Sequence, residues 1–344
     1  MITRACTILG SRRKSERRGF ETRHGKPLRP VVCIILGFFV TAKGRLFVPL
    51  WKRGEYADVV LNRHAQQRLT GKELRSLTIT PGSLSLCYSQ EVEEAPVRTV
   101  YGVDRNEKNM TFGDAEGVVQ IDMADTVKIR QTTRRIVGSF KRDGARVRRK
   151  LASKYWKRCR DRTSQILHAA TNFAVDVASR NGAALALEDL IDIRSMYRKG
   201  NGQGPDYRFR LNSWPFWKAC RMLEYKSAWK GVTMIRLTRS ETYGPSSECG
   251  ERLYELERED AGRMLWCRAC KMWTDMDVNA ALNLSRRGLA RFASSLPPRP
   301  ASQQVYLLAT GDKGGAVEAV KGNTTKTAIL RVDASKSSLR PDED

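Results

Sequence analysis

The feature that most constrains the fold is an uninterrupted apolar run, Ala183–Leu187, which ends in Glu188. A run of this length with no polar position is typical of a strand buried on both faces at the centre of a sheet. An amphipathic stretch, Ile166–Ala178, precedes it and has the pattern of a helix packed on a sheet. The chain is therefore expected to build a sheet with a buried central strand that ends in a carboxylate.

Other segments extend this organisation. Three short β-prone runs, Val100–Asp104, Asn109–Phe112 and Val118–Ile121, follow one another closely and predict a meander. A helical stretch is predicted from about Val127 to Arg180, and another strand at Gly231–Leu237. Short strands separated by Gly, Pro and Asn turns predict a small β-module, part of a barrel, over residues 31–98.

Three carboxylates stand at the ends of predicted elements. Asp104 closes the first run of the meander, Glu188 closes the apolar strand, and Asp277 precedes a predicted helix, Asp277–Phe292. Each has a plain structural interpretation: Asp104 as a turn residue, Glu188 as a solvated strand end, and Asp277 as a helix N-cap. Together they match a chemical demand, since two divalent ions that clamp a phosphodiester need bridging and flanking carboxylates, and Mg²⁺ prefers oxygen ligands.

The residues around these acids resemble a known family. In chain order, these residues are Gly-Val-Asp104 and Asn-Met-Thr111, then Leu-Glu188-Asp-Leu, a Cys-containing hairpin, and Asp-Met-Asp277-Val-Asn-Ala-Ala-Leu-Asn. This order is similar to the three RuvC motifs of TnpB, the insertion-sequence OrfB proteins related to type V CRISPR effectors. The resemblance covers about residues 31–340. The third motif is the most specific. Arg105 and Asn106 stand where many relatives have Leu-Gly.

This resemblance implies an α/β fold of the RNase H-like (RuvC) type, a mixed sheet with flanking helices. It implies an RNA-guided DNA endonuclease that hydrolyses phosphodiesters with Mg²⁺, two ions being expected, held by Asp104, Glu188 and Asp277. The guide RNA would come from the transposon end, and the partner would be target DNA. The expected domains are a basic flexible arm, 1–30; the β-module, a partial barrel of wedge type, 31–98; the first part of the nuclease domain, 99–241; a degenerate zinc-ribbon insertion, 242–273; the last part of the nuclease domain, 274–296; and a flexible tail, 297–344.

Three of the eight cysteines cluster. Cys267-Arg-Ala-Cys270 is a CxxC knuckle, and Cys249-Gly250 matches the end of the family's preceding CxxC, with Ser246 in place of the first cysteine. Structural zinc normally takes four Cys or His ligands, so the expected site is a degenerate zinc ribbon. Two outcomes stay open: zinc held weakly by three thiolates, with water or Glu248 completing the shell, or zinc lost.

The charge balance indicates a polyanionic partner. Lys and Arg number 62 against 37 Asp and Glu, a formal net charge of +25, and nucleic acid is the commonest polyanion. Residues 128–163 hold 15 of these cations and two acids, too few pairs for helix salt bridges, which favours binding to phosphates. The candidate contacts are Arg134, Arg135, Lys141, Arg142, Arg146, Arg148, Arg149, Lys150, Lys154, Lys157 and Arg158.

The sequence predicts no membrane partner and a cytoplasmic protein. The longest apolar run, Val31–Val40, holds ten residues, whereas a membrane-spanning helix needs about 20. Two alternatives to the nuclease remain. One is a truncated or repurposed relative that binds RNA or DNA without cutting, favoured by Ser246 and by the short segment, about 103 residues, before Asp104. The other is a transposase-accessory protein or a transposase that joins strands.

Overall fold

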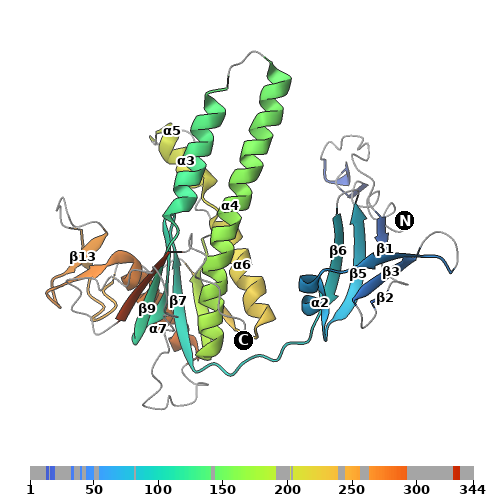
Figure 1. Cartoon of the computed structure of the whole chain (residues 1–344). Coiled ribbons are helices and arrows are strands. Elements are labelled where there is room, and N and C mark those ends of the chain that lie inside the picture. The colour runs from blue at the N-terminus through green and yellow to red at the C-terminus, as the bar shows by residue number, and fades with distance from the viewer. Residues whose placement is uncertain are drawn as a thin grey trace. The chain divides into compact units, whose positions relative to one another are not determined.

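The computed structural model describes two compact units, Met1–Glu91 and Val92–Asp344 (Figure 1). The described residues are 13–14, 16–19, 32–34, 39–40, 44–49, 54–80, 83–140, 144–190, 202, 204–238, 245–255, 263–292 and 328–333. The boundary at residues 91 and 92 lies a few residues before the position expected from the sequence, because the segment 92–98 hydrogen-bonds to later residues of the second unit. The backbone N–H groups of Ala95 and Arg98 donate to the carbonyls of Gly231 and Gly182.

Among the described residues, the first unit holds two three-stranded antiparallel sheets and the short helix α2. The sheets have the orders β1-β5-β6 and β2-β3-β4. They share a small core of Leu46, Val48, Leu61 and Leu77. The elements are β1 Val32–Ile34, β2 Phe39–Val40, β3 Arg45–Pro49, β4 Tyr56–Val60, α2 Arg63–Leu69, β5 Glu73–Thr80 and β6 Ser83–Ser89. The β-module is thus present, and within its described residues the strands form no closed barrel.

The second unit is built on a mixed six-stranded sheet with the order β11-β10-β7-β8-β9-β15. Strands β7, β8 and β9 form the antiparallel meander, β10 runs parallel to β7, and β11 runs parallel to β10. Their bounds are β7 Thr99–Arg105, β8 Asn109–Asp114, β9 Gly117–Asp122, β10 Ala183–Glu188, β11 Met234–Leu237 and β15 Ala328–Asp333. The strand predicted at Ala183–Leu187 is confirmed as a central, fully buried strand.

Helices cover both faces of this sheet (Figure 1). On one face, α4 (Ala145–Arg180) and α6 (Phe216–Trp229) pack against Val103, Phe112 and Leu187. On the other face lies α7 (Met276–Phe292), whose Leu284 joins Val100 and Ala186 in a separate core. Because side chains alternate along a strand, Asp104 and Glu188, next to Val103 and Leu187, point to the face that α7 covers.

The helical stretch predicted from about Val127 to Arg180 forms two helices, with a break that the sequence analysis did not predict. Helix α3 spans Ala124–Gly138 and α4 spans Ala145–Arg180, and they form an antiparallel hairpin (Figure 1). Gly144, which precedes α4, has a φ of +79°, a left-handed conformation that favours glycine. The sequence Asp143-Gly144 was the local signal for this break.

The flexible tail predicted over residues 297–344 needs a correction at residues 328–333. These residues form β15, which pairs in parallel with β9 along its whole length, from Ala328 opposite Gly117 to Asp333 opposite Asp122. Apolar residues 328–330 followed by Val332 make this segment suitable for an edge strand. Within the part of the chain that the structure describes, no helix is long and apolar enough to cross a membrane.

The segment with the cysteines forms a small sheet next to α7. Strands β12 (Leu253–Tyr254), β13 (Met264–Cys267) and β14 (Met272–Asp275) are antiparallel neighbours in that order. Strand β14 leads directly into α7. The cysteine segment is therefore held next to the first turn of the helix that carries Asp277.

Candidate active site

Asp104 lies near the end of β7, against the sheet face that α7 covers. Its side chain is only 4 % exposed. Gly102, two residues earlier, allows α7 to approach closely, because a Cβ atom there would lie 1.9 Å from the carbonyl oxygen of Ala281. The Gly-Val-Asp sequence therefore places a carboxylate beside a helix whose backbone nearly touches the strand.

Glu188 ends the strand next to Asp104 in the sheet. In the parallel pairing of β10 with β7, Leu187 is opposite Val103, so Glu188 follows in step with Asp104 at the same sheet edge. Glu188 is 5 % exposed. The buried guanidinium of Arg105 donates to the backbone carbonyl of Glu188 at 2.5 Å, which ties the ends of the two strands together.

Asp277 is supplied by the first turn of α7 and is 1 % exposed. It is not the residue that caps the helix. Asp275 does so, accepting hydrogen bonds at its Oδ1 from the backbone N–H groups of Asp277 (2.9 Å) and Val278 (3.1 Å). The carboxylate of Asp277 is therefore available for other contacts.

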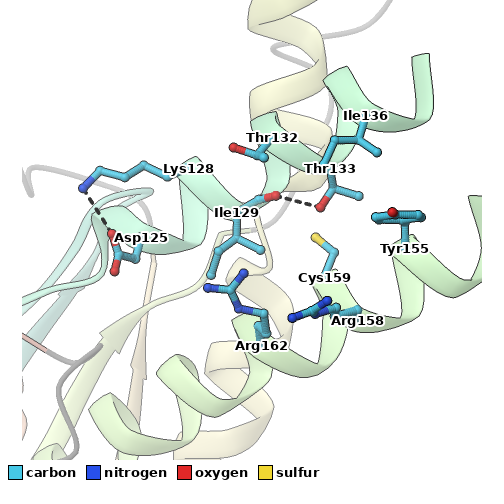
Figure 2. Close-up of a pocket in the computed structure, with 10 residues that line it drawn as sticks. All are labelled: Asp125, Lys128, Ile129, Thr132, Thr133, Ile136, Tyr155, Arg158, Cys159 and Arg162. Atoms are coloured by element: carbon cyan, nitrogen blue, oxygen red, sulfur yellow. Dashed lines mark hydrogen bonds and ion pairs between the residues drawn. The ribbon is translucent and has the colours of Figure 1, made fainter. Parts of the chain in front are cut away.

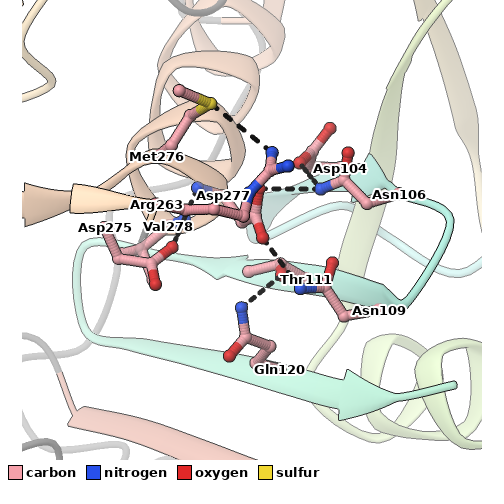
Figure 3. A network of polar contacts seen from close by, with 10 residues as sticks. All are labelled: Asp104, Asn106, Asn109, Thr111, Gln120, Arg263, Asp275, Met276, Asp277 and Val278. Atoms are coloured by element: carbon pink, nitrogen blue, oxygen red, sulfur yellow. Dashed lines mark hydrogen bonds and ion pairs between the residues drawn. The ribbon is translucent and has the colours of Figure 1, made fainter. Parts of the chain in front are cut away.

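A polar network joins Asp277 to Asp104 (Figure 3). The Nδ2 atom of Asn106 donates to both carboxylates, at 2.6 Å to Asp104 and 2.8 Å to Asp277. The Nδ2 atom of Asn109 donates to the other oxygen of Asp277 at 2.8 Å. Arg263, from the turn before β13, forms an ion pair with Asp277 at 2.5 Å. These contacts connect residues separated by up to 171 positions in the sequence.

The structure thus brings two of the three predicted acids together and places the third beside them. Asp104 and Asp277 share the amide of Asn106, and Glu188 is the neighbour of Asp104 in the sheet. Among the described residues, no three carboxylates have ligand oxygens that all lie within 4.8 Å of one another. The arrangement is a row of buried, hard oxygen donors, the type of ligand that Mg²⁺ prefers. One guanidinium balances part of their charge, and two neutral amides donate hydrogen bonds to them.

The three predicted thiol ligands do form a compact group. The Sγ atoms of Cys249, Cys267 and Cys270 all lie within 4.8 Å of one another. Cys249 Sγ is 3.5 Å from Cys267 Sγ, and the backbone N–H of Cys270 donates to Cys267 Sγ at 3.4 Å. A backbone N–H from Glu251 and the thiol of Cys270 lower the pKa of Cys249 to about 7, whereas Cys249 is the main cause that raises the pKa of Cys270. The group fits a soft metal ion, which binds thiolates.

Ser246, which the sequence places where the family has a further cysteine, lies beside the thiol group. Its side chain is a hydrogen-bond partner of Cys249, and it accepts from the backbone N–H of Glu248 at 3.2 Å. Ser246 is buried, with 5 % exposure. The hydroxyl therefore points at the thiol group, as the fourth side chain of a zinc ribbon would.

Two asparagines of α7 hold the Cys249 loop. The Nδ2 atoms of Asn279 and Asn283 both donate to the carbonyl of Pro245 at 2.9 Å. The Oδ1 atom of Asn279 accepts from the backbone N–H of Ser247 at 2.7 Å. The asparagines of the Asp-Val-Asn-Ala-Ala-Leu-Asn motif thus connect the thiol group to the helix that carries Asp277.

The predicted nucleic-acid contacts have different environments. Arg134 forms an ion pair with Asp206 at 2.6 Å and lies over the ring of Phe209, so it has partners within the protein. Lys141 and Arg142 lie outside the described residues, as does the side chain of Arg146. The remaining candidates are exposed: Arg135, Arg148, Arg149, Lys150, Lys154, Lys157 and Arg158. Most of the exposed cations therefore lie along one helix, α4.

The sequence did not identify Asn109 and Arg263 as parts of the site. It drew attention to Asn106 only as a departure from Leu-Gly. Asparagines near the start of a strand are common turn residues, so Asn106 and Asn109 did not stand out as site residues. Arg263 stands in a hairpin among other arginines. Only the pairing of β7 with β8, and of β13 with β14, brings these side chains to Asp277.

Comparison with known proteins gives three findings. A model of the family described as "Cas12f1-like, TNB domain" matches residues 216–284, which span α6 and the cysteine segment and reach into α7. A "TnpB-like protein" of Methanocaldococcus jannaschii is 24% identical over 271 residues, which cover 75% of this chain and 88% of the relative. A chain in the cryo-EM structure of a Cas12f1-sgRNA-target DNA complex is 14% identical, with a TM-score of 0.49, and the match covers 75% of this chain and 59% of that chain.

The family model covers two of the features that carry the resemblance. The matched region includes the cysteine segment and the start of α7 with Asp277, and the match to the M. jannaschii protein extends over most of both chains. On these grounds the chain is similar to TnpB-like proteins and, over residues 216–284, to the Cas12f1-like family.

Proposed function

We propose that this protein is a metal-dependent DNA endonuclease, guided by RNA, that uses Asp104, Glu188 and Asp277 to hydrolyse phosphodiester bonds. The observation that supports this most is the shared amide of Asn106, which holds Asp104 beside Asp277 although 173 positions separate them in the sequence. Burying carboxylates side by side is costly unless a ligand compensates their charge. A catalytic metal site gives a reason for this arrangement.

The strand order supports an RNase H-like (RuvC) fold. An antiparallel meander, β7-β8-β9, is followed by β10 parallel to β7 and β11 parallel to β10. The acids lie at the end of the first strand of the meander, at the end of β10 and in α7, which packs on the same face. This is the placement that the family resemblance implies for the three metal ligands.

The residues fit Mg²⁺. Asp104, Glu188 and Asp277 offer buried oxygen donors, and in the family two ions are expected. When bound, Mg²⁺ supplies charge stabilisation of the phosphodiester and lowers the pKa of an attacking water. The chain's own groups position the acids: Asn106 and Asn109 orient the carboxylate of Asp277, and Arg105 fixes the carbonyl of Glu188. Arg263 supplies a cation at the same carboxylate.

The nucleic-acid partners follow from charge and family. Exposed cations along α4 offer a track for a phosphate backbone. Within the family resemblance, the partners are a guide RNA from the transposon end and a target DNA, and base pairing between them selects the sequence. The thiol group of Cys249, Cys267 and Cys270 would hold Zn²⁺ and stabilise the hairpin that carries Arg263.

The experiment compares three proteins with one substrate. The wild-type chain, Glu188→Ala and Glu116→Gln are each expressed with the RNA transcribed from the gene's own locus and incubated with plasmid DNA and Mg²⁺. Glu116 lies in the β8–β9 turn and is exposed, so its variant controls for the loss of one acid. We expect cutting by the wild type and by Glu116→Gln, and none by Glu188→Ala. Cutting that persists in Glu188→Ala would contradict the assignment.

A second candidate is a relative that binds nucleic acid without cutting it. Both oxygens of Asp277 already accept hydrogen bonds, from Asn106 and Arg263 at Oδ1 and from Asn109 at Oδ2. A carboxylate so occupied has fewer lone pairs for a metal ion. Tight RNA or DNA binding by the wild type and by Glu188→Ala, with no cutting by either, is the result that supports this candidate.

A further inference from the structure

A cavity of about 380 Å³ lies between α3 and α4, away from the carboxylates (Figure 2). Thr132 and Thr133 of α3 and Cys159 of α4 are small residues at this level. The hydroxyl of Thr133 donates to the carbonyl of Ile129 in its own helix at 2.8 Å. Small side chains therefore leave a space that larger ones would fill.

The walls of the cavity differ in chemistry. Ile129, Ile136 and the buried Cys159 form an apolar floor. The ring of Tyr155 closes one end of the cavity and also contacts the ring of Phe140, with the two ring centroids 5.7 Å apart. An apolar floor with an aromatic wall is a surface on which a flat, partly apolar group can stack.

Cations surround the opening. Arg158 and Arg162 are one helical turn apart on α4, and Figure 2 shows their guanidinium groups side by side between the helices. Both side chains are exposed, and neither forms an ion pair with a residue that the structure describes. Lys128, across the gap on α3, pairs with Asp125 at 3.1 Å. Two neighbouring guanidinium groups that form no ion pair with a described carboxylate attract an anion, and a phosphate fits their planar donors.

The combination matches one class of ligand. Phosphate alone would use the arginines and leave the apolar floor and Tyr155 exposed. A nucleotide has a phosphate for Arg158 and Arg162, a flat base for the apolar floor and Tyr155, and amino or hydroxyl donors for the carboxylate of Asp125. A volume of about 380 Å³ is at the lower end of the range for small-molecule pockets, roughly 300–1,000 Å³, and suits a single nucleotide.

We propose that the cavity between α3 and α4 binds one unpaired nucleotide, whose phosphate contacts Arg158 and Arg162 and whose base stacks in the space beside Tyr155. The bound nucleotide is either one residue of a single-stranded nucleic acid or a free nucleotide. Its assignment to a nucleic-acid chain rests on the proposed function, whereas the binding itself does not, because the cavity shares no lining residue with the carboxylate site.

The test uses AMP as the probe, with inorganic phosphate and adenosine as its two halves. Binding to the full chain is measured by titration calorimetry at low salt without Mg²⁺. We expect AMP to bind more tightly than either half. The double variant Arg158→Gln with Arg162→Gln should weaken AMP binding by about tenfold or more, since hydrogen bonds to charged groups are lost. The matched control is Arg148→Gln with Arg149→Gln, which removes the same charge from the same helix outside the cavity.

A second variant separates shape from charge. Thr132→Phe places a larger side chain at the cavity and leaves the net charge unchanged. It should abolish AMP binding while the exposed arginines remain. Thr132 is exposed, so the fold should persist, and circular dichroism checks this.

The outcomes are distinct. Equal AMP affinity in the two double-arginine variants, or phosphate that binds as tightly as AMP, would overturn the proposal. Competition by a single-stranded oligonucleotide assigns the nucleotide to a polymer, and lack of competition assigns it to a free nucleotide. Glu188→Ala should bind AMP like the wild type. If AMP binds but plasmid DNA is never cut, the nuclease proposal fails and the nucleotide site stands.

Discussion

The backbone of Gly102 faces the carbonyl oxygen of Ala281 so closely that a Cβ atom on Gly102 would lie 1.9 Å from that oxygen. The same Cβ would lie 2.5 Å from the backbone nitrogen of Ser285. Strand β7 and helix α7 are therefore in near-contact through their backbones, and this contact sets the distance between Asp104, two residues after Gly102, and Asp277, four residues before Ala281.

Gly102→Ala should destabilise the protein, because the two nearest neighbours of the new Cβ are backbone atoms that cannot rotate away. Overpacking of this kind costs about 1–3 kcal/mol in the free energy of unfolding. The variant should also lose more Mg²⁺-dependent cutting than its lower stability accounts for. The reason is that α7, which carries Asp277, has to move away from β7. Urea unfolding measures the first effect and plasmid cleavage the second.

The control is Gly138→Ala, at the end of α3, where a Cβ would meet no atom within 4 Å. Its stability should change by less than that of Gly102→Ala and in the stabilising direction, since alanine favours helices. A Gly102→Ala protein as stable as the wild type would show that α7 does not press on β7.

Asn106→Ala should make the thermal stability of the protein depend more strongly on Mg²⁺. Without the shared amide, two buried carboxylates face each other, and the loss of partners costs about 1–3 kcal/mol. A divalent ion then restores more stability than it does in the wild type. Thermal unfolding with and without Mg²⁺ should show a larger rise in Tm for the variant.

Asn212→Ala serves as the comparison, because Asn212 donates to the carbonyl of Arg208 in an exposed helix and has no contact with the acids. Its response to Mg²⁺ should equal that of the wild type. If Mg²⁺ leaves the Tm of all three proteins unchanged, the proposed metal site is wrong.

Ser246→Cys should increase the zinc content of the purified protein. The wild-type chain offers three thiols within 4.8 Å and a hydroxyl, and we expect less than one zinc per chain after dialysis against chelator. A fourth thiolate completes the tetrahedral set that structural zinc prefers, so the variant should hold one equivalent. Metal analysis by mass spectrometry gives the stoichiometry.

Cys87→Ser provides a matched test, since Cys87 is an exposed cysteine of the first unit, and its loss should not alter zinc content. A full equivalent of zinc in the wild type would show that three thiolates suffice. Zinc bound equally by Cys267→Ser would place the metal elsewhere.

The buried Lys226 should give the stability a pH dependence. It donates to the carbonyl of His168 at 2.8 Å and to the hydroxyl of Thr171 at 2.6 Å. Burial lowers its pKa from 10.5 to about 8, an effect that Asp176 partly opposes. Between these pH values the unfolded chain holds the proton and the folded chain does not, so this group adds stability as the pH rises from about 8 towards 10.5.

Lys226→Met should lack this rise, and the difference between the two unfolding curves isolates the contribution of Lys226. Lys218→Met, on the exposed side of the same helix, should keep it. A difference between wild type and Lys226→Met that stays constant from pH 7 to pH 10 would show that the folded lysine keeps an ordinary pKa.

Much of the fold was predictable from short stretches of sequence. The apolar run at Ala183–Leu187 and the meander from Val100 to Ile121 were identified because burial imposes its pattern on neighbouring residues. The break between α3 and α4 was missed, since helix-forming residues lie on both sides of a loop whose local signal is Asp143-Gly144. The strand at residues 328–333 was missed because its partner, β9, is about 200 positions away.

The features of the candidate site also divide into those that the sequence identified and those that only the structure shows. The sequence by itself determined which residue types were present: three acids at the ends of elements, three cysteines with one serine in the fourth place, and an excess of cations over residues 128–163. Only the tertiary structure decided that Asn106, Asn109 and Arg263 meet at Asp277, and that α3 and α4 enclose a cavity beside Arg158. The physical reason is that burial and local conformation depend on adjacent residues, whereas these contacts depend on how strands pair and how closely helices pack.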